Sequence, residues 1–392
     1  MNEPAGPKTG GCTYTHDVIE LVVDAVQTLV RVPSVNPTIA PDEGTGEQAV
    51  AAAARDWLKR HEVNAWLEDA APGRPNCVAE LGSGDGPTVV LCAHLDTVGT
   101  AGMTIPPFEP AIENGRLYGR GSYDMKGSAG AIMAAAVTLS QSLVGGRVLV
   151  ALVADEEDAS AGAVDFVNRH RADACIVTEP SEGHLVLAHK GFVWLEVTTR
   201  GTAAHGSRWD LGASAVGRMA PIIIALERFD REDLRARTHP LVGPASMHCA
   251  LIEGGTGWST YAPECRLKIE RRTIPGETPA QVLREIEEVV RAAGEQAEVR
   301  VVFDRPPLVS NRDDRIVECV RDSVTQVAGR APREVGVAYW MDAAIFAAAG
   351  IPTVNYGPTG EGAHAAVEWV DVQSVVTTAR VLVESARRFC AV

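Results

Sequence analysis

The feature that most constrains the fold is a series of short apolar runs separated by helical stretches. The runs cover residues 88–93, 148–154 and 175–178, and helical patterns at 125–143 and 161–171 fall between them. Near-continuous apolar runs are typical of strands buried on both faces, and helices that alternate with them are typical of a parallel sheet. The sequence therefore predicts an α/β domain with a largely parallel sheet flanked by helices.

A different order of elements begins near residue 190. The pattern predicts strand, helix, strand, strand, helix, strand, with the strands near 191–197, 247–252, 265–273 and 298–303 and the helices at 213–228 and from 278 onward. This order is typical of the ferredoxin-like motif, a four-stranded sheet with two helices on one face. Because 392 residues exceed what one core usually serves, we expect a discontinuous domain, 1–189 and 304–392, with a smaller ferredoxin-like α+β domain, 190–303, inserted in it.

The net charge of the chain disfavours several kinds of partner, and its cysteines indicate a reducing compartment. Asp and Glu total 51 against 36 Lys and Arg, and the net charge of -15 repels phosphate backbones and anionic lipid surfaces. No apolar run reaches the length of a membrane-spanning helix. The eight cysteines are scattered without a CxxC pair, which is typical of reduced thiols. We expect a cytoplasmic protein that binds neither nucleic acid nor membranes.

Each of the three apolar runs is followed directly by residues that bind metals. His94 follows the first run and Glu179 the third, while the acidic stretch 155–158 follows the second. Open α/β sheets form their sites beyond the carboxyl ends of the strands. We therefore expect these side chains to meet at one edge of the sheet.

Two glycine-rich segments supply further candidate ligands. Segment 119–127 leaves Asp124 at the start of a helix, and segment 357–364 ends on His364. Two imidazoles and three carboxylates without a thiolate suit two closely spaced divalent ions such as Zn²⁺, Mn²⁺ or Co²⁺. One carboxylate is expected to bridge the ions, which would activate a shared water and stabilise an oxyanion.

The water also needs a general base. Adjacent residues at a strand exit point in opposite directions, so that of Glu156 and Glu157 one can bind metal while the other faces the water. Asp96, two residues after His94, is placed to hold the second nitrogen of that imidazole. Any one of these residues taken alone is more often structural or solvated, but five at strand ends and glycine loops favour a metal site.

Taken together, these blocks resemble a known family, the dinuclear zinc amidohydrolases. That family includes acetylornithine deacetylase, succinyl-diaminopimelate desuccinylase, aminoacylase and glutamate carboxypeptidase. The similar segments span roughly residues 90 to 370 in the family's order and are 94–98, 119–127, 155–157, 179–181 and 362–364.

The resemblance implies a role for each candidate. Asp124 would bridge two ions, which in this family are Zn²⁺, and Glu156 would be the base. The remaining ligands divide into two pairs, His94 with Glu179 on one ion and Glu157 with His364 on the other.

The resemblance also implies that the inserted domain is a lid that carries the interface of a homodimer. His205 matches a lid histidine that reaches the scissile carbonyl oxygen, in some relatives from the partner subunit, and Arg272 matches a residue that recognises the substrate carboxylate. The alternatives are a His205 that satisfies nearby backbone groups and an Arg272 that forms a cross-strand ion pair.

The sequence departs from the family around Trp340. Where desuccinylases and aminoacylases often have a Ser/Thr-Asp-x-Arg block, this chain reads Trp-Met-Asp-Ala-Ala over 340–344. A site without that guanidinium binds a second carboxylate less well, which disfavours diaminopimelate desuccinylation. The indole of Trp340 would instead suit a flatter or more apolar acyl group or side chain.

These observations predict a metal-dependent amidohydrolase that cleaves the amide bond of an N-acyl amino acid or small peptide. One alternative is that the same metal site serves as a small dipeptidase or carboxypeptidase, or acts on another C–N bond. The alternative of another class is a catalytically silent binding or scaffold homologue. Such a homologue is expected to have lost a ligand or the base, and this sequence retains all of them.

Overall fold

The chain divides into two compact units in the computed structural model, which describes residues 14–82 and 84–391. Unit 1 comprises Met1–Leu185, Arg315–Pro332 and Val354–Val392, and unit 2 comprises Val186–Asp314 and Arg333–Thr353. The domain limits expected from the sequence, 190 and 303, stay a prediction.

A largely parallel sheet forms the centre of unit 1. Its strands are, in spatial order, β1 (Ala65–Ala71), β2 (Arg74–Leu81), β6 (Arg147–Val153), β3 (Thr88–His94), β7 (Ala174–Val177) and β17 (Thr353–Asn355). β3 lies parallel to both β6 and β7, whereas β1 and β2 form an antiparallel hairpin at the β6 side. The predicted α/β fold is confirmed, and the hairpin is an addition to it.

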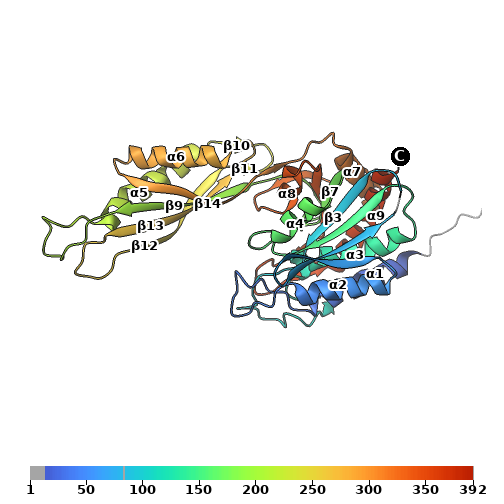
Figure 1. Ribbon diagram of the computed structural model, residues 1–392. Coiled ribbons are helices and arrows are strands. Elements are labelled where there is room, and N and C mark those ends of the chain that lie inside the picture. Colours follow the sequence, from blue (N-terminus) through green and yellow to red (C-terminus); the bar gives the residue numbers. More distant parts are fainter. Residues whose placement is uncertain (1–13, 83, 392) are drawn as a thin grey trace, which may run out of the picture. The chain divides into compact units, whose positions relative to one another are not determined.

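Helices cover this sheet (Figure 1). They are α1 (Tyr14–Val30), α2 (Gln48–Arg60), α3 (Gly127–Ser140), α4 (Ala161–Arg169), α7 (Arg315–Ala328) and α9 (Val372–Cys390). α3 packs against α1, α9 and β3 and is buried along most of its length, because its glycines and alanines allow close approach. A Cβ at Gly130 would lie 2.4 Å from the side chain of Val26. This packing fixes the segment that enters α3, which carries Asp124.

A small antiparallel sheet joins two distant loops of unit 1. Its strands are, in spatial order, β18 (Gly360–Glu361), β19 (Trp369–Asp371), β5 (Arg116–Tyr118) and β4 (Ile112–Glu113). Pairing of β19 with β5 places the loop before β19, which contains His364, beside the turn η1 (Ser122–Lys126), whose backbone is not helical at Asp124.

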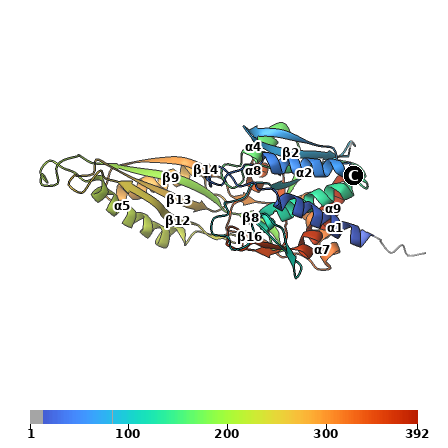
Figure 2. The same ribbon diagram turned by 90° about the horizontal axis from the view of Figure 1, so that it is seen from below.

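Unit 2 contains the ferredoxin-like fold. Its elements follow in the order β9 (Gly191–Arg200), α5 (Ala215–Phe229), β12 (Ser246–Gly254), β13 (Glu264–Thr273), α6 (Pro279–Ala292) and β14 (Ala297–Arg305). The sheet order is β12-β13-β9-β14, and every neighbouring pair is antiparallel. Alternate residues of β9, such as Leu195 and Val197, join a core with both helices, and Figure 2 shows α5 alongside β12 and β13.

The remaining elements of unit 2 are short. β8 (Leu185–His189) pairs with β15 (Leu308–Val309) and with β16 (Glu334–Val337), and the others are η2 (Asp230–Leu234), β10 (Thr238–His239), β11 (Gly243–Pro244) and α8 (Ala343–Ala348). Within residues 14–82 and 84–391, no helix is long and apolar enough to cross a membrane.

Candidate metal centre

Three strand ends place the first ligands at one edge of the unit 1 sheet. β3 ends at His94, which is level with the last residue of β6, and β7 ends level with Cys92. Glu157 and Glu179 therefore follow their strands at the same edge. The Nε2 atom of His94 lies 3.6 Å from Oε1 of Glu179, with both side chains buried.

Asp124 lies between the two imidazoles. Its Oδ1 is 3.1 Å from Nε2 of His94, and its Oδ2 is 3.3 Å from Nε2 of His364. The same His364 nitrogen is 3.2 Å from Oε2 of Glu157. All five residues that the sequence singled out as ligands thus lie together, and each oxygen of Asp124 faces a different histidine.

Glu156 lies beside this cluster. Ligand atoms of His94, Glu156 and Glu179 all lie within 4.8 Å of one another, and the same holds for His94, Asp124 and Glu157. The two groups share His94. The half-buried Glu156 carboxylate therefore reaches the space around which the candidate ligands are arranged.

The electrostatic field of the cluster favours positive charge. Hydrogen bonds to Asp124 and Glu157 raise the pKa of His364 to about 10. Burial opposes protonation of His94, but the charge of Glu179 and the hydrogen bond to Asp124 raise its pKa well above the ordinary value. Burial disfavours ionised Asp124, but hydrogen bonds to the two imidazoles hold its pKa below the ordinary range. Carboxylate and imidazole donors in such a field are a donor set that fits divalent cations.

Sequence reasoning missed Glu368, which orders the loop that carries Asp124. The buried Glu368 carboxylate accepts hydrogen bonds from the backbone N–H groups of Gly121, Tyr123 and Asp124 at 2.9–3.0 Å. The guanidinium of Arg120 donates to it at 2.8 Å. The only signal for Glu368 in the sequence is that it lies four residues after His364. Its hydrogen-bond partners can be identified only from the fold.

Asp96 is engaged differently from the sequence-based expectation. Its carboxylate lies 3.6 Å from Nδ1 of His94, whereas its own carbonyl oxygen lies 3.0 Å from that nitrogen. The carboxylate instead accepts the backbone N–H groups of Glu156 and Glu157 at 3.0 and 3.1 Å, and the side-chain amide of Asn36 at 2.8 Å. Asp96 therefore contacts both His94 and the turn that follows β6.

The other three predicted site residues lie in unit 2. His205 is exposed, and its Nδ1 is 2.8 Å from the hydroxyl of Ser207. Arg272 lies near the end of β13 and pairs at 2.8 Å with Glu270, two residues earlier on the same strand, so this ion pair differs from the cross-strand pair considered as its alternative role. The indole N–H of Trp340 donates to a backbone carbonyl oxygen at 3.1 Å. Their roles toward a substrate stay predictions.

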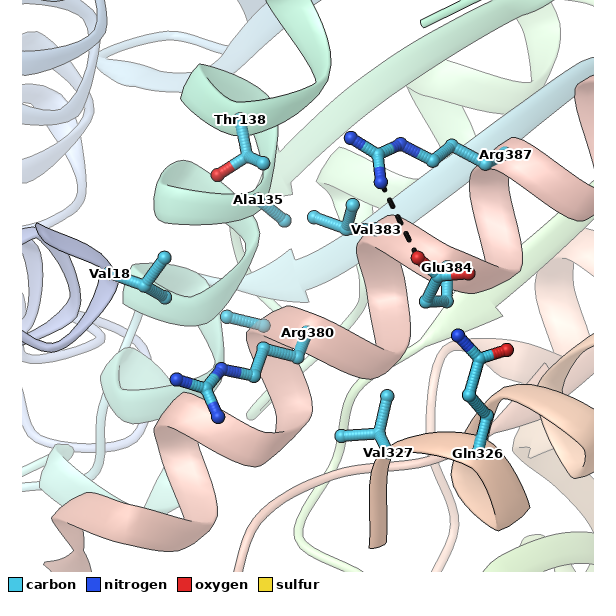
Figure 3. A pocket seen from close by; sticks show the side chains of 10 residues that line it. Val18, Ala135, Thr138, Gln326, Val327, Arg380, Val383, Glu384 and Arg387 are labelled. Atoms are coloured by element: carbon cyan, nitrogen blue, oxygen red, sulfur yellow. Dashed lines mark hydrogen bonds and ion pairs between the residues drawn. The ribbon is translucent and has the colours of Figure 1, made fainter. Parts of the chain in front are cut away.

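A separate pocket of about 490 Å³ lies among α1, α3, α7 and α9 (Figure 3). Arg380 and Arg387 are among its lining residues, and Arg387 pairs with Glu384 at 3.4 Å. The described residues that line it include none of the candidate ligands.

The chain is similar to known proteins over most of its length. The model of a family described as Peptidase family M20/M25/M40 matches residues 90–388. The chain is 31% identical to an acetylornithine deacetylase of Myxococcus xanthus over 84% of this chain and 88% of that protein. It is 28% identical to N-formyl-4-amino-5-aminomethyl-2-methylpyrimidine deformylase of Bacillus subtilis (strain 168), over 84% and 85%.

The fold is also similar to a solved structure. A dinuclear metal-binding peptidase of the M20 family from Bacillus subtilis superimposes with a TM-score of 0.70 at 17% identity. The similarity covers 95% of this chain and 99% of that one.

Proposed function

Because the chain belongs to peptidase family M20/M25/M40, we propose that it is a two-metal hydrolase that cleaves the amide bond of an N-acyl amino acid or small peptide. The family resemblance found in the sequence is confirmed, and the chain is an enzyme of the hydrolase class. The observation that carries the proposal is Asp124, whose two oxygens each face a different histidine at 3.1 and 3.3 Å. This is the arrangement expected of a carboxylate that bridges two cations.

The donor set supports two divalent ions. His94 and Glu179 would hold one, Glu157 and His364 the other, and Asp124 would bridge them. Such a pair of ions lowers the pKa of a shared water and stabilises negative charge on a carbonyl oxygen. Zn²⁺ suits these nitrogen and oxygen donors, and Mn²⁺ or Co²⁺ would also fit.

The remaining catalytic roles are carried out by side chains of the protein. Glu156 accepts a proton from the attacking water and returns it to the leaving nitrogen, because its carboxylate reaches the ligand cluster without being needed as the bridge. Asp96 would orient His94 chiefly through its backbone carbonyl oxygen, which lies 3.0 Å from Nδ1. From the resemblance, His205 would donate to the developing oxyanion and Arg272 would bind the substrate carboxylate, with Trp340 beside a flat or apolar group.

Two further features belong to the proposal. A cytoplasmic location is supported by the described cysteines, which are thiols and not disulfides, while Cys12 lies outside the described residues. A homodimer through the unit 2 sheet is supported by exposed apolar side chains on the edge strand β12, among them Leu251 and Ile252.

A second candidate reaction uses the same site on another C–N bond. The similarity to a deformylase favours including formamides, because that relative is named for removing a formyl group. A small dipeptidase or carboxypeptidase activity needs the same ligands and base. A silent scaffold is disfavoured, since the five ligands and Glu156 all lie together.

A substrate panel with a base variant tests the proposal. The panel contains N-acetyl and N-formyl amino acids and dipeptides, each assayed with Zn²⁺, Mn²⁺ or Co²⁺. We expect Glu156→Gln to lower kcat by about 10²–10⁴-fold, because it removes a proton acceptor without removing a ligand. Metal content and melting temperature should stay unchanged.

Asp158→Asn is the matched control for Glu156→Gln. Asp158 lies in the same acidic turn and is half-buried, but it is not among the candidate ligands. Its kcat should stay within about threefold of wild type, since it is neither the proposed base nor a candidate ligand. If wild type hydrolyses no member of the panel, the proposed function is wrong. If Glu156→Gln keeps its kcat, Glu156 is not the base.

A further inference from the structure

A buried ion cluster lies behind the turn that carries Glu156 and Glu157. Arg74, the first residue of β2, donates from Nε to Glu47 at 2.8 Å, and its two terminal nitrogens contact Glu47 and Asp155. The side chains of Glu47, Asp155 and Arg74 are only 0%, 5% and 12% exposed. One guanidinium therefore forms ion pairs with two buried carboxylates at once.

Asp155 connects this cluster to the catalytic turn. It directly precedes Glu156, and its backbone has a φ of 72°, in the left-handed region that is uncommon for non-glycine residues. Its Oδ1 accepts from Asn36 at 3.1 Å as well as from Arg74, and its backbone N–H donates to Glu47 at 3.2 Å. Contacts to Arg74, Asn36 and Glu47 thus hold this conformation.

The contacts continue to the other side of the turn. The amide of Asn36 bridges Asp155 and Asp96, and Asp96 accepts the backbone N–H groups of Glu156 and Glu157. The turn is held from both sides by one connected set of buried hydrogen bonds. Among the described residues that these hydrogen bonds join, Arg74 is the positively charged one.

Arginine is suited to this position and lysine is not. A guanidinium presents several N–H donors in a fixed fork and can join two carboxylates, whereas an ammonium is a compact point charge. Removing the charge altogether would leave Glu47 and Asp155 buried without compensation, which is strongly destabilising. A lysine would keep the charge but lose the fixed geometry.

We propose that Arg74 is a positioning residue that, through Asp155, holds the turn of residues 155–157 so that Glu156 and Glu157 face the metal centre. Its effect on turnover rests on the proposed function, whereas its effect on metal binding by Glu157 does not. Arg74 itself touches neither the candidate ligands nor Glu156 in the contacts described above. The proposal therefore predicts altered kcat and metal affinity without altered substrate affinity.

Arg74→Lys tests this inference with two readouts. Competition with a chelator should show that the weaker-bound Zn²⁺ or Co²⁺ ion binds about tenfold less tightly than in wild type, because Glu157 is less well oriented. At saturating metal, kcat should fall by about tenfold or more while KM stays within about threefold. Metal affinity is measured on the protein alone, without a substrate.

Arg147→Lys is the matched control. Arg147 begins β6 and pairs with Glu80 of β2 at 3.2 Å, so that this ion pair joins the same two strands at their opposite ends. Both readouts should match wild type. A double variant, Arg74→Met with Glu47→Gln, removes the guanidinium together with one buried charge, and should show the same two losses as Arg74→Lys.

Each result decides the matter. Arg74→Lys within twofold of wild type in both metal affinity and kcat would overturn the proposal, as would equal losses in Arg147→Lys. Failure of both Arg74 variants to fold would overturn it in favour of a purely structural role. If wild type hydrolyses no panel substrate, the proposed function fails, and the metal affinities alone decide the role of Arg74.

Discussion

His364 and His189 show how surroundings set the charge of the same side chain. His364 lies between two carboxylates, which raise its pKa to about 10. His189 lies fully buried on β8, with Nδ1 2.9 Å from the carbonyl oxygen of Lys190, and burial lowers its pKa to about 4. The first environment attracts cations and the second excludes a proton. Only the first could be anticipated from the sequence, because nothing around His189 marks it as buried and neutral.

The low pKa of His189 predicts that acid weakens the fold. The imidazole of the unfolded chain has a pKa near 6.5, whereas that of the folded protein has a pKa of about 4. Between these pH values the unfolded state binds a proton that the folded state does not, so stability is lost as pH falls from about 6.5 to 4. By pH 5 this amounts to about 2 kcal/mol in the free energy of unfolding. The free energy of unfolding, measured with urea, should fall between pH 7.5 and pH 5 by about 2 kcal/mol less in His189→Asn than in wild type. The exposed His248 provides the control as His248→Asn, and equal pH dependence in all three proteins would contradict this account.

At the scale of secondary-structure elements, the sequence predicted the helices and strands whose burial is uniform or strictly periodic. β3, β6 and β7 are buried along nearly all their length and were recognised as apolar runs. The hairpin of β1 and β2 was missed, because Glu68 and Asp69 break the pattern of β1. The small sheet of β4, β5, β18 and β19 was missed as well, since strands of two or three residues leave no periodicity. That sheet nevertheless brings Asp124 and His364 together.

The edge strand β12 leads to a prediction about assembly. Its Leu251 is 57% exposed, and Ile224 on the adjoining helix α5 is 69% exposed. An edge strand with apolar neighbours can pair with a second copy about a two-fold axis. Sedimentation velocity should show a dimer for wild type and a shift toward monomer for Leu251→Lys. Val302→Lys, on β14 at the opposite edge of the same sheet, should stay dimeric. A strictly monomeric wild type would contradict the dimer and exclude His205 acting in the partner's site.

At the scale of the whole molecule, the candidate centre is assembled from segments far apart in the chain. The ligand types could be predicted because each follows a buried strand or lies in a glycine-rich loop, as His94 and His364 do. The groups that hold them, such as Glu368, Asn36 and Arg74, could not. Their partners lie 60 or more residues away in most contacts, and a carboxylate or arginine in sequence does not reveal what it will bind.

The central claim is that two cations held by this cluster make the protein a hydrolase. The most direct measurement is elemental analysis of active protein, followed by chelator treatment and assay before and after the metal is returned. We predict about two divalent ions per chain, loss of amide hydrolysis when they are removed, and recovery with Zn²⁺, Mn²⁺ or Co²⁺. Full activity in protein that retains no metal ion would contradict the claim.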